Sequence, residues 1–348
     1  MKKLLSFLKY VLLLAVSAFL MWYALKELDF MKMWDELKNA SYSWIILSLV
    51  MGVISYMSRA YRWRMQFNST GYQPSLGNTY NAMMFGYVAN LVLPRMGEVA
   101  RCTMLRRTEG IPVNTGFGTV IAERFVDMLM LLLVIGITFL VELDRLQDLL
   151  LGLFADKYNN LEKSLDSLYL IGGITVAVIA IALVLILVFL NQLRQNKYFL
   201  KVTGFLKGML DGIFSLSKLE NPVAYWLHTF FVWGMYYGMS LVVFYALPAT
   251  AHLSFGAALS VLVIGSLGMA APVQGGIGVY HILVQTTLLL YGVPKEGGMA
   301  YALLAHTSQT LLVVLMGVLS FMAGMLRRNK PVAETIQAEV TTHHEINR

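Results

Sequence analysis

A succession of long apolar runs constrains the fold of this chain more than any other feature of its sequence. One run, from Ile174 to Leu190, contains no charged residue. About 20 such residues in a helix cross the hydrocarbon core of a bilayer, which is roughly 30 Å thick. Only 14% of the 348 residues are charged, against about 25% in soluble domains. We therefore expect an all-α, polytopic membrane helix bundle.

About eight membrane-spanning helices are predicted, at about residues 7–25, 44–62, 115–141, 168–190, 223–247, 253–271, 276–291 and 300–325. The first run follows three lysines and is long for a signal peptide, so we favour an uncleaved helix. Residues 1–328 then form a single integral membrane domain. The polar segment 329–348 is expected to be a disordered cytoplasmic tail.

A further apolar segment, about residues 80–93, is too short to cross the bilayer at 1.5 Å per residue. If this segment enters and leaves by one face, the basic loops and both termini share one side of the membrane. The loop 142–166, with six acidic and three basic residues, then lies on the other side. We interpret 80–93 as a re-entrant half-helix and place both termini in the cytoplasm. A complete crossing would instead place the arginines that follow it outside.

Two prolines interrupt apolar regions and mark broken helices. Pro94 and Pro272 are each followed by glycine and polar residues. Non-helical backbone at membrane depth persists only where protein or a water-filled cavity satisfies its polar groups. Broken helices in corresponding positions of two halves are a pointer to a transport site built from inverted repeats. An inverted repeat is indicated here by position and by proline and glycine content alone, because no residue-level repeat is visible.

The first group of candidate binding residues is the pair Arg59 and Arg62, at the expected cytoplasmic end of the span 44–62. The two arginines are three apart and share a helix face, and paired guanidinium groups suit bidentate phosphate binding. Arginines that snorkel beside an aromatic belt are the structural alternative. Arg64 is assigned to topology alone.

The second group surrounds the first broken helix and comprises Asn90, Pro94, Arg95, Gly97, Glu98 and Arg101. A helix that begins at Pro94 would carry Arg95 in its first turn, where unpaired N–H groups favour an anion. Arg95, Glu98 and Arg101 would then form one stripe. We predict a phosphate site here; an internal ion pair that closes the broken helix is the structural alternative.

The third group, Glu123, Arg124 and Asp127, lies well inside the span 115–141. The two acids share a helix face, and Arg124 is spaced to pair with Asp127. Ionisable groups at this depth need partners, which Arg59, Arg62, Arg95 or Arg101 can supply. Such a network can line a head-group path or simply lock helices together, and the two roles are compatible.

The fourth group is the loop that holds Gly275, Gly276 and Gly278, followed by His281. These glycines allow close backbone approach or tight helix packing, and their N–H groups can form an anion nest. The loop lacks the Lys-Ser/Thr ending of a nucleotide-binding loop, which argues against an ATPase. His281 can carry a proton, bind a ligand or be a hydrogen-bonded core residue, and the last is the default. His306 and Gln309 can line a polar path, although such groups more often bond across helices.

Several other functional classes are excluded by composition and spacing. The single cysteine, Cys102, excludes an internal disulfide and a cysteine-rich metal site. The histidines lack metal-binding spacing, and no nucleophile elbow is present. The net charge of +7 follows from the orientation rule for membrane proteins. We therefore expect no metal, no cofactor and no nucleic-acid partner.

Taken jointly, three of these elements resemble a known family. The string Asn90–Glu98 with Arg101, the element Glu123-Arg124-x-x-Asp127 and the loop Pro272–Gly278 resemble the flippase-like transmembrane domain of lysylphosphatidylglycerol synthases, over about residues 5–327. The resemblance implies a domain that moves an aminoacylated lipid between leaflets, coupled in full-length enzymes to an aminoacyl-transferase domain. Because the chain ends about twenty residues after the last span, a stand-alone member without synthase activity is expected. An acidic residue common in the family after the glycine loop is replaced by Tyr280-His281, which leaves the lipid open.

We therefore expect a lipid flippase or head-group transporter of a bacterial cytoplasmic membrane, not an enzyme. Its substrate would be an anionic phospholipid or a polyprenyl-phosphate-linked lipid, driven by a gradient or moved passively. Phosphate would bind near Arg95 and Arg101, and the acids would hold the arginines and relay protons. The alternatives are a small-anion or solute transporter, favoured by an enclosed cavity instead of a lateral opening, and a non-transporting partner of a lipid-modifying transferase. Homo-oligomerisation and an enzyme partner both stay open.

Overall fold

The computed structural model describes residues 2–93, 95–143 and 216–327, and the side chains of the first helix from Leu14 onward. All regular structure in these ranges is helical, which confirms the all-α membrane class. The predicted span 168–190, the tail 329–348 and Pro94 lie outside the described residues. The chain begins with α1 (Lys2–Leu25) and the short α2 (Phe30–Lys38).

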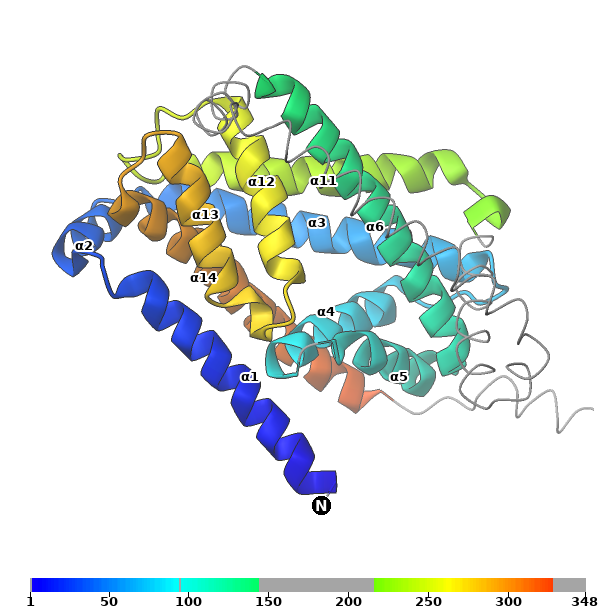
Figure 1. The fold of residues 1–348 in the computed structure, drawn as a ribbon. Helices are drawn as coiled ribbons and strands as arrows, with labels where there is room; N and C mark the ends of the chain where they lie inside the picture. The colour runs from blue at the N-terminus through cyan, green and yellow to red at the C-terminus, as the bar shows by residue number, and fades with distance from the viewer. Residues whose placement is uncertain (1, 94, 144–215, 328–348) are drawn as a thin grey trace, which may run out of the picture. The chain divides into compact units, whose positions relative to one another are not determined.

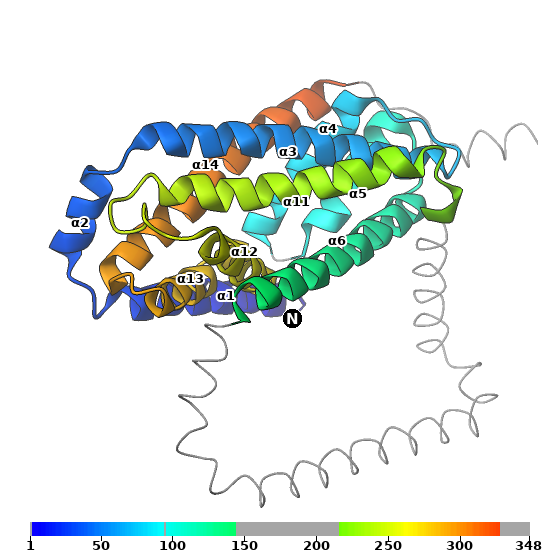
Figure 2. The same cartoon turned by 90° about the horizontal axis from the view of Figure 1, so that it is seen from above.

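Among the described residues, four long helices have the length and apolar composition to cross a membrane: α3 (Tyr42–Asn68), α6 (Val113–Val141), α11 (Pro222–Phe244) and α14 (Lys295–Leu326). Figures 1 and 2 show α3 and α11 side by side and antiparallel. Helix α3 continues six residues beyond the predicted end at Arg62. Arg59 and Arg62 therefore lie inside the helix and not at its end. Their charges are tolerated there because a neighbouring carboxylate pairs with them.

Four shorter helices form two hairpins. The first consists of α4 (Leu76–Val92) and α5 (Gly97–Glu109), the second of α12 (Phe255–Ala270) and α13 (Val279–Leu290). Even α4, with 17 residues, is only about 26 Å long at 1.5 Å per residue, short of the roughly 30 Å core. The predicted half-helix at 80–93 is therefore present as α4. The predicted full spans 253–271 and 276–291 are instead two short helices that form the second hairpin.

The order of long and short helices occurs twice along the chain. Helices α3 to α6, the first repeat, run long, short, short, long, and helices α11 to α14, the second repeat, do the same. Because α3 and α11 are antiparallel, the two repeats run in opposite directions (Figure 2). This is the arrangement of an inverted repeat. In the sequence, only the position and the proline and glycine content of the two broken helices indicated it.

The tips of the two hairpins touch each other. The side-chain amide of Gln274 donates a hydrogen bond of 3.5 Å to the carbonyl of Val92. Helix α1 packs against the second tip, where a Cβ at Gly278 would lie 2.5 Å from the Cβ of Leu20. Gly278 also has a φ of +85°, a conformation that only glycine adopts without strain. The glycine loop thus lets the second tip, the first tip and α1 meet.

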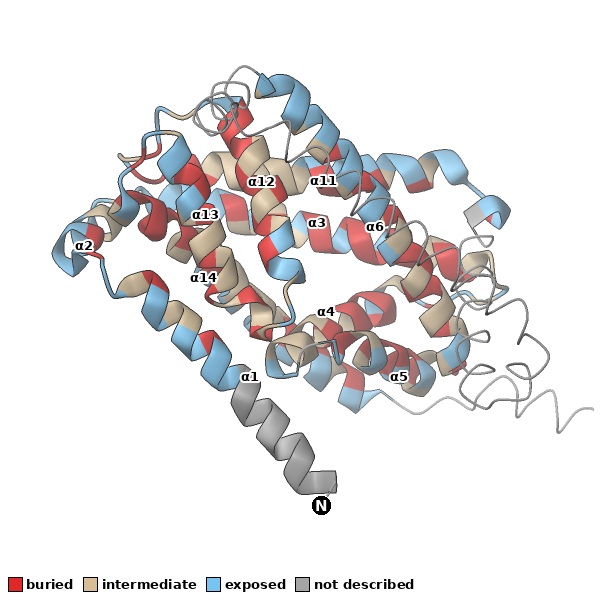
Figure 3. Ribbon diagram, in the orientation of Figure 1, coloured by how far each residue is buried: buried red, intermediate tan, exposed pale blue. Residues whose placement is uncertain are grey.

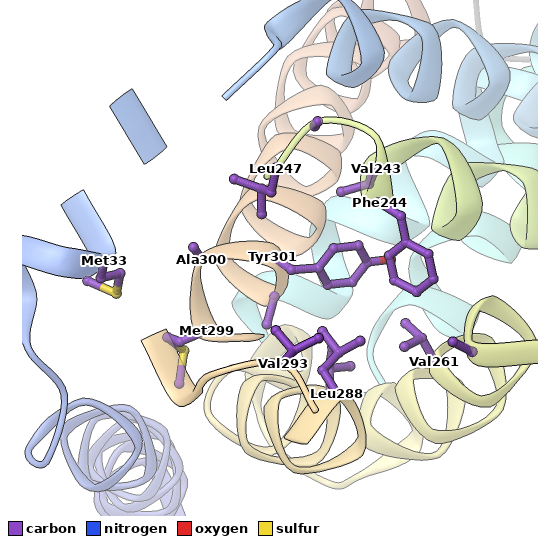
Figure 4. Close-up of a cluster of buried hydrophobic side chains, with 14 of the residues drawn as sticks. Met33, Val243, Phe244, Leu247, Val261, Leu288, Val293, Met299, Ala300 and Tyr301 are labelled. Atoms are coloured by element: carbon purple, nitrogen blue, oxygen red, sulfur yellow. The ribbon is translucent and has the colours of Figure 1, made fainter. Parts of the chain in front are cut away.

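Apolar clusters pack the two repeats differently. The cluster in Figure 4 joins α11, α12, α13 and α14 through buried residues such as Phe244, Leu288 and Tyr301. A second cluster joins α3, α4 and α5 around Trp63 and Phe67. The outward faces of α2 and α6 are exposed (Figure 3), as expected where a bundle meets lipid.

Helix α2 was not predicted from the sequence. The Asp29 side chain caps it by accepting hydrogen bonds from the N–H groups of Met31 and Lys32, as N-terminal caps do. Met33 is buried in the bundle, whereas Phe30 and Trp34 are more than half exposed. A helix of nine residues with a polar face gives no signal in a search for membrane spans.

Candidate functional site

Three arginines surround one buried glutamate at the centre of the first repeat. Glu123 Oε1 accepts hydrogen bonds from Arg59 Nε at 3.0 Å and Nη2 at 2.6 Å. Its Oε2 accepts from Arg101 Nη1 at 2.7 Å, and Arg62 Nη2 lies 3.5 Å from Oε1. The side chain of Glu123 is 1% exposed. The expectation that arginines from other elements balance the acids of α6 is met by Arg59, Arg62 and Arg101.

Asp127 extends this network by one helical turn. It accepts hydrogen bonds from Arg59 Nη2 at 2.9 Å and from Arg62 Nη2 at 2.7 Å. Because Asp127 follows Glu123 by four residues, both carboxylates lie on the face of α6 that meets α3. The Asp127 side chain is 17% exposed, more than that of Glu123.

Other side chains hold the same arginines in place. Arg59 Nη1 donates a 2.8 Å hydrogen bond to the hydroxyl of Tyr236 on α11, and the Arg101 guanidinium lies 4.6 Å from the centre of the Trp63 ring. Three guanidinium groups face two carboxylates, so this cluster carries a net charge of +1. Buried charges are tolerated only when they are paired and hydrogen-bonded, and here each of the three guanidinium groups contacts at least one carboxylate. The cluster is therefore a buried ionic centre with an excess of positive charge.

Arg124 has a different partner from the one predicted. Its Nη2 donates a 2.9 Å hydrogen bond to Glu98 Oε1 on α5, instead of pairing with Asp127. Arg124 is rotated away from Glu123 and Asp127 around α6, and 48% of its side chain is exposed. It therefore meets the start of α5, where Glu98 also suits the helix dipole.

Arg95 is also placed differently from the prediction. Helix α5 begins at Gly97, so Arg95 precedes the first turn and does not form a stripe with Glu98 and Arg101. Its φ of +66° is left-handed, which costs roughly 1–2 kcal/mol for a residue with a Cβ. The N–H group of Gly97 donates a 2.7 Å hydrogen bond to Asn90 Oδ1. Asn90 therefore occupies part of the helix end that was predicted to bind an anion.

The glycine loop directs its N–H groups into its own turn. The N–H of Gly276 donates to the carbonyl of Val273 at 3.5 Å, and that of Gly278 donates to His281 Nδ1 at 3.4 Å. Gly275 has a φ of +58°, and its carbonyl accepts a 2.7 Å hydrogen bond from His306 Nε2. This geometry, with the close neighbours of Gly276 and Gly278, favours the tight-packing interpretation over an anion nest.

His281 is buried beside that turn. It is 1% exposed, and the centre of its ring lies 4.9 Å from that of His306. Its Nδ1 accepts the hydrogen bond from Gly278, whereas its buried Nε2 has no hydrogen-bond partner among the described residues; the default interpretation of a hydrogen-bonded core histidine is thus met at one ring nitrogen only.

A partly open cavity of about 720 Å³ lies between the two repeats. Its charged residues are Arg59, Arg95, Glu98, Arg124 and Asp127. Arg62, Arg101 and Glu123 lie behind this wall and support it. The predicted His306 and Gln309 line the opposite, neutral wall. Three tyrosines near Arg59, namely Tyr56, Tyr87 and Tyr236, also line it; sequence reasoning missed them because aromatic residues occur throughout membrane helices.

The cavity reaches the surface at the level of the hairpin tips. Arg95, Arg124, Met128, Met269 and Pro272 line the cavity and are exposed. They come from the tip of the first hairpin, from the middle of α6 and from the tip of the second hairpin. The opening is therefore on the side of the bundle and not at the end of the long helices.

Comparison with known proteins identifies a family and two relatives. The profile of the family described as "Lysylphosphatidylglycerol synthase TM region" matches residues 10–317. Glycosyltransferase AglD of Haloferax volcanii is 22% identical over 332 residues, covering 88% of this chain and 53% of AglD. The UPF0104 membrane protein MJ1595 of Methanocaldococcus jannaschii is 27% identical over 92 residues, or 26% of this chain and 27% of that protein. This chain thus spans about half the length of AglD, and no solved structure matches it.

Proposed function

The chain belongs to the family of the lysylphosphatidylglycerol synthase transmembrane region, and from this premise we propose that it is a lipid flippase. Its substrate is an anionic phospholipid or a polyprenyl-phosphate-linked lipid, whose head group crosses the membrane through the cavity between the repeats. The chain acts without catalysis of its own, in a cytoplasmic membrane of the bacterial type, with both termini in the cytoplasm.

The observation that carries this proposal is the lateral opening to a cationic cavity. The rim includes two half-exposed methionines, Met128 and Met269, together with the exposed Arg95 and Arg124, and the interior presents Arg59. A lipid can keep its tails in hydrocarbon while its phosphate reaches the guanidinium groups, which bind phosphate through charge-assisted hydrogen bonds. Only the head-group path then needs charged residues, which is where they gather.

Two other functions compete with this one. A small-anion or solute transporter would need an enclosed binding site, and the position of the opening beside the hairpin tips supports a lipid instead. A non-transporting partner of a lipid-modifying transferase is favoured by the name of the relative AglD, a glycosyltransferase. That relative is only 22% identical, so its name alone does not assign an activity to this chain.

Arg95 offers a direct test, because its replacement by glycine should lower lipid exchange without lowering folding stability. Arg95→Gly removes a cavity charge and also relieves the left-handed backbone, so folding stability is expected to stay unchanged or to rise by about 1 kcal/mol. Exchange of fluorescent phosphatidylglycerol between leaflets of proteoliposomes should fall about tenfold, as expected for one lost charge-assisted contact. Arg95→Lys, which keeps the charge, should retain most of the rate.

The control is Glu27→Gln, which removes an exposed carboxylate 3.8 Å from Lys295 on the surface and is expected to have no effect on lipid exchange. Wild-type protein that exchanges neither anionic nor polyprenyl-phosphate-linked lipid above the rate of empty vesicles would contradict transport. Topology is tested by attaching reporters to the two termini, and an external terminus would contradict the orientation.

A further inference from the structure

Resting on the proposed function, we propose that Asp127 is an exchangeable counter-ion of Arg59. The phosphate of an arriving lipid takes the place of Asp127, and the loss of this carboxylate removes two of the ion pairs that tie α6 to α3, so that α6 can pivot about the remaining contact of Glu123 with Arg59. The bundle then opens at the end of α3 marked by Asn68, called here the Asn68 end. Asp127 is therefore a positioning residue that couples head-group binding to opening.

The two carboxylates that contact Arg59 are not equivalent. Glu123 accepts from both Nε and Nη2 of Arg59, also binds Arg101, and is almost fully buried behind the cavity wall. Asp127 accepts from Nη2 alone, keeps 17% of its side chain exposed and lines the cavity. An anion that enters from the lateral opening therefore reaches the Asp127 side of Arg59, while Glu123 continues to hold the arginine in place.

A phosphate is a suitable competitor for this position. It offers several oxygens to the guanidinium groups, where Asp127 offers one oxygen to Arg59 and one to Arg62. Arginine binds phosphate in bidentate geometry. The phosphate also brings its charge without requiring α6 to stay beside α3, which the carboxylate of Asp127 does require.

A layer of side chains separates the ionic cluster from the Asn68 end. Trp63, Gln66, Phe67 and Tyr225 are all fully buried. Trp63 Nε1 donates a 2.9 Å hydrogen bond to Thr119 Oγ1, and Gln66 Nε2 donates a 2.7 Å hydrogen bond to the hydroxyl of Tyr225. Phe67, at the far side of the layer, lies eight residues beyond Arg59 in α3, about 12 Å along the helix. A shift of α6 breaks the contact with Thr119 and opens this layer.

The opposite end of the bundle has no comparable release mechanism among its described residues. The cluster around Phe244, Leu288 and Tyr301 is apolar and fully buried, and the ion pair Glu27–Lys295 at that end lies exposed on the surface, outside this cluster. Well-packed apolar contacts resist gradual separation. The ionic end is thus the end that a phosphate can open.

The chain carries a built-in reporter of this movement. Cys102 is its single cysteine, follows Arg101 on α5 and is 1% exposed. A Cβ added at Gly116 of α6 would lie 3.0 Å from the Cys102 Sγ, so the thiol sits in the contact between α5 and α6. A movement of α6 away from α3 also opens this contact at Gly116 and exposes the thiol.

The test measures maleimide labelling of Cys102 in nanodiscs of phosphatidylcholine with and without phosphatidylglycerol. Phosphatidylglycerol should accelerate labelling of the wild type about tenfold, because labelling of a buried group reports local opening. Asp127→Asn should label fast even in pure phosphatidylcholine, and Asp127→Glu, which keeps the carboxylate, should stay slow there. Glu27→Gln is the matched control and should behave as the wild type.

Two measurements keep the outcome interpretable. Thermal unfolding of Asp127→Asn checks that fast labelling comes from a folded protein. If this variant has the unfolding midpoint of the wild type but its Cys102 is labelled slowly, the proposal is overturned. If Asp127→Asn fails to fold, the response of the wild type to phosphatidylglycerol decides alone, and an unchanged rate overturns it. The same samples are assayed for lipid exchange. Exchange without a labelling response leaves the flippase standing and removes the counter-ion role, whereas a labelling response without exchange removes transport and keeps the counter-ion role.

Discussion

The two repeats share one architecture but differ sharply in charge. Both run long, short, short, long, with a hairpin whose tip reaches the other hairpin. Residues 42–141, which form the first repeat, contain twelve charged residues, whereas residues 222–326 of the second contain two, Lys295 and Glu296 at the start of α14. Since the second repeat builds the same hairpin without internal charges, the fold itself does not require them. Buried charges are costly in a membrane, so those of the first repeat point to function.

The repeats also differ in what holds their helices together. In the first, α3, α5 and α6 are joined by ion pairs to Glu123 and Asp127. In the second, apolar side chains around Phe244 and Leu288 join the helices (Figure 4). Ion pairs can exchange partners with an anionic ligand, whereas apolar packing cannot. The first repeat is therefore suited to respond to a phosphate and the second to remain rigid.

The largest effect is expected from Glu123→Gln in the charged repeat. Three arginines lose their shared carboxylate, and uncompensated buried charge typically costs about 3–5 kcal/mol. The midpoint of thermal unfolding in detergent should fall strongly. A midpoint close to that of the wild type would mean that the ion pairs do not hold the first repeat together.

The matching change in the neutral repeat is Leu288→Ala. Leu288 is fully buried, and removal of such a side chain leaves a cavity that costs about 3 kcal/mol. Stability should fall by less than in Glu123→Gln, while lipid exchange per folded molecule stays the same. A loss of lipid exchange per folded molecule would contradict the view that the second repeat has a structural role.

Tyr236→Phe tests the point where the neutral repeat supports the charged one. Its hydroxyl accepts the 2.8 Å hydrogen bond from Arg59, and a bond to a charged group contributes about 2 kcal/mol. The midpoint of thermal unfolding and the affinity for phosphatidylglycerol should both fall, because Arg59 loses a fixed partner. Equilibrium binding in nanodiscs measures the affinity, and an unchanged value would remove Tyr236 from the site.

The smallest effect is expected for Tyr301→Phe, which removes a hydroxyl within the neutral repeat. That hydroxyl donates a 2.7 Å hydrogen bond to the carbonyl of Ser240, and a neutral hydrogen bond contributes about 1 kcal/mol. The midpoint of thermal unfolding should fall slightly, with lipid affinity unaffected, because the variant keeps the ring that lines the cavity and removes no charged contact. If Tyr301→Phe lowered the affinity as much as Tyr236→Phe, the functional contrast between the repeats would not hold.

Much of this organisation could be predicted from local sequence patterns. The length of the apolar runs determined the helical membrane class, and the short segment before Pro94 determined a half-helix. The spacing of four residues determined that Glu123 and Asp127 share a face. Such predictions succeed because length and helical periodicity are properties of a segment itself. The end of α3 was misplaced because a charge such as Arg62 normally stops a span, unless distant residues pair it.

What only the tertiary structure decided is which groups those faces meet. Arg59 and Glu123 are separated by 64 positions in the chain, and no spacing rule relates residues so far apart. Packing placed Glu123 behind the cavity wall and Asp127 on it, paired Arg124 with Glu98, and made a hairpin of two segments predicted as spans. The sequence by itself determined the helices, their faces and the concentration of charge in one half. The three-dimensional contacts decided which charges are buried supports and which face the cavity, because burial depends on neighbours from every other element.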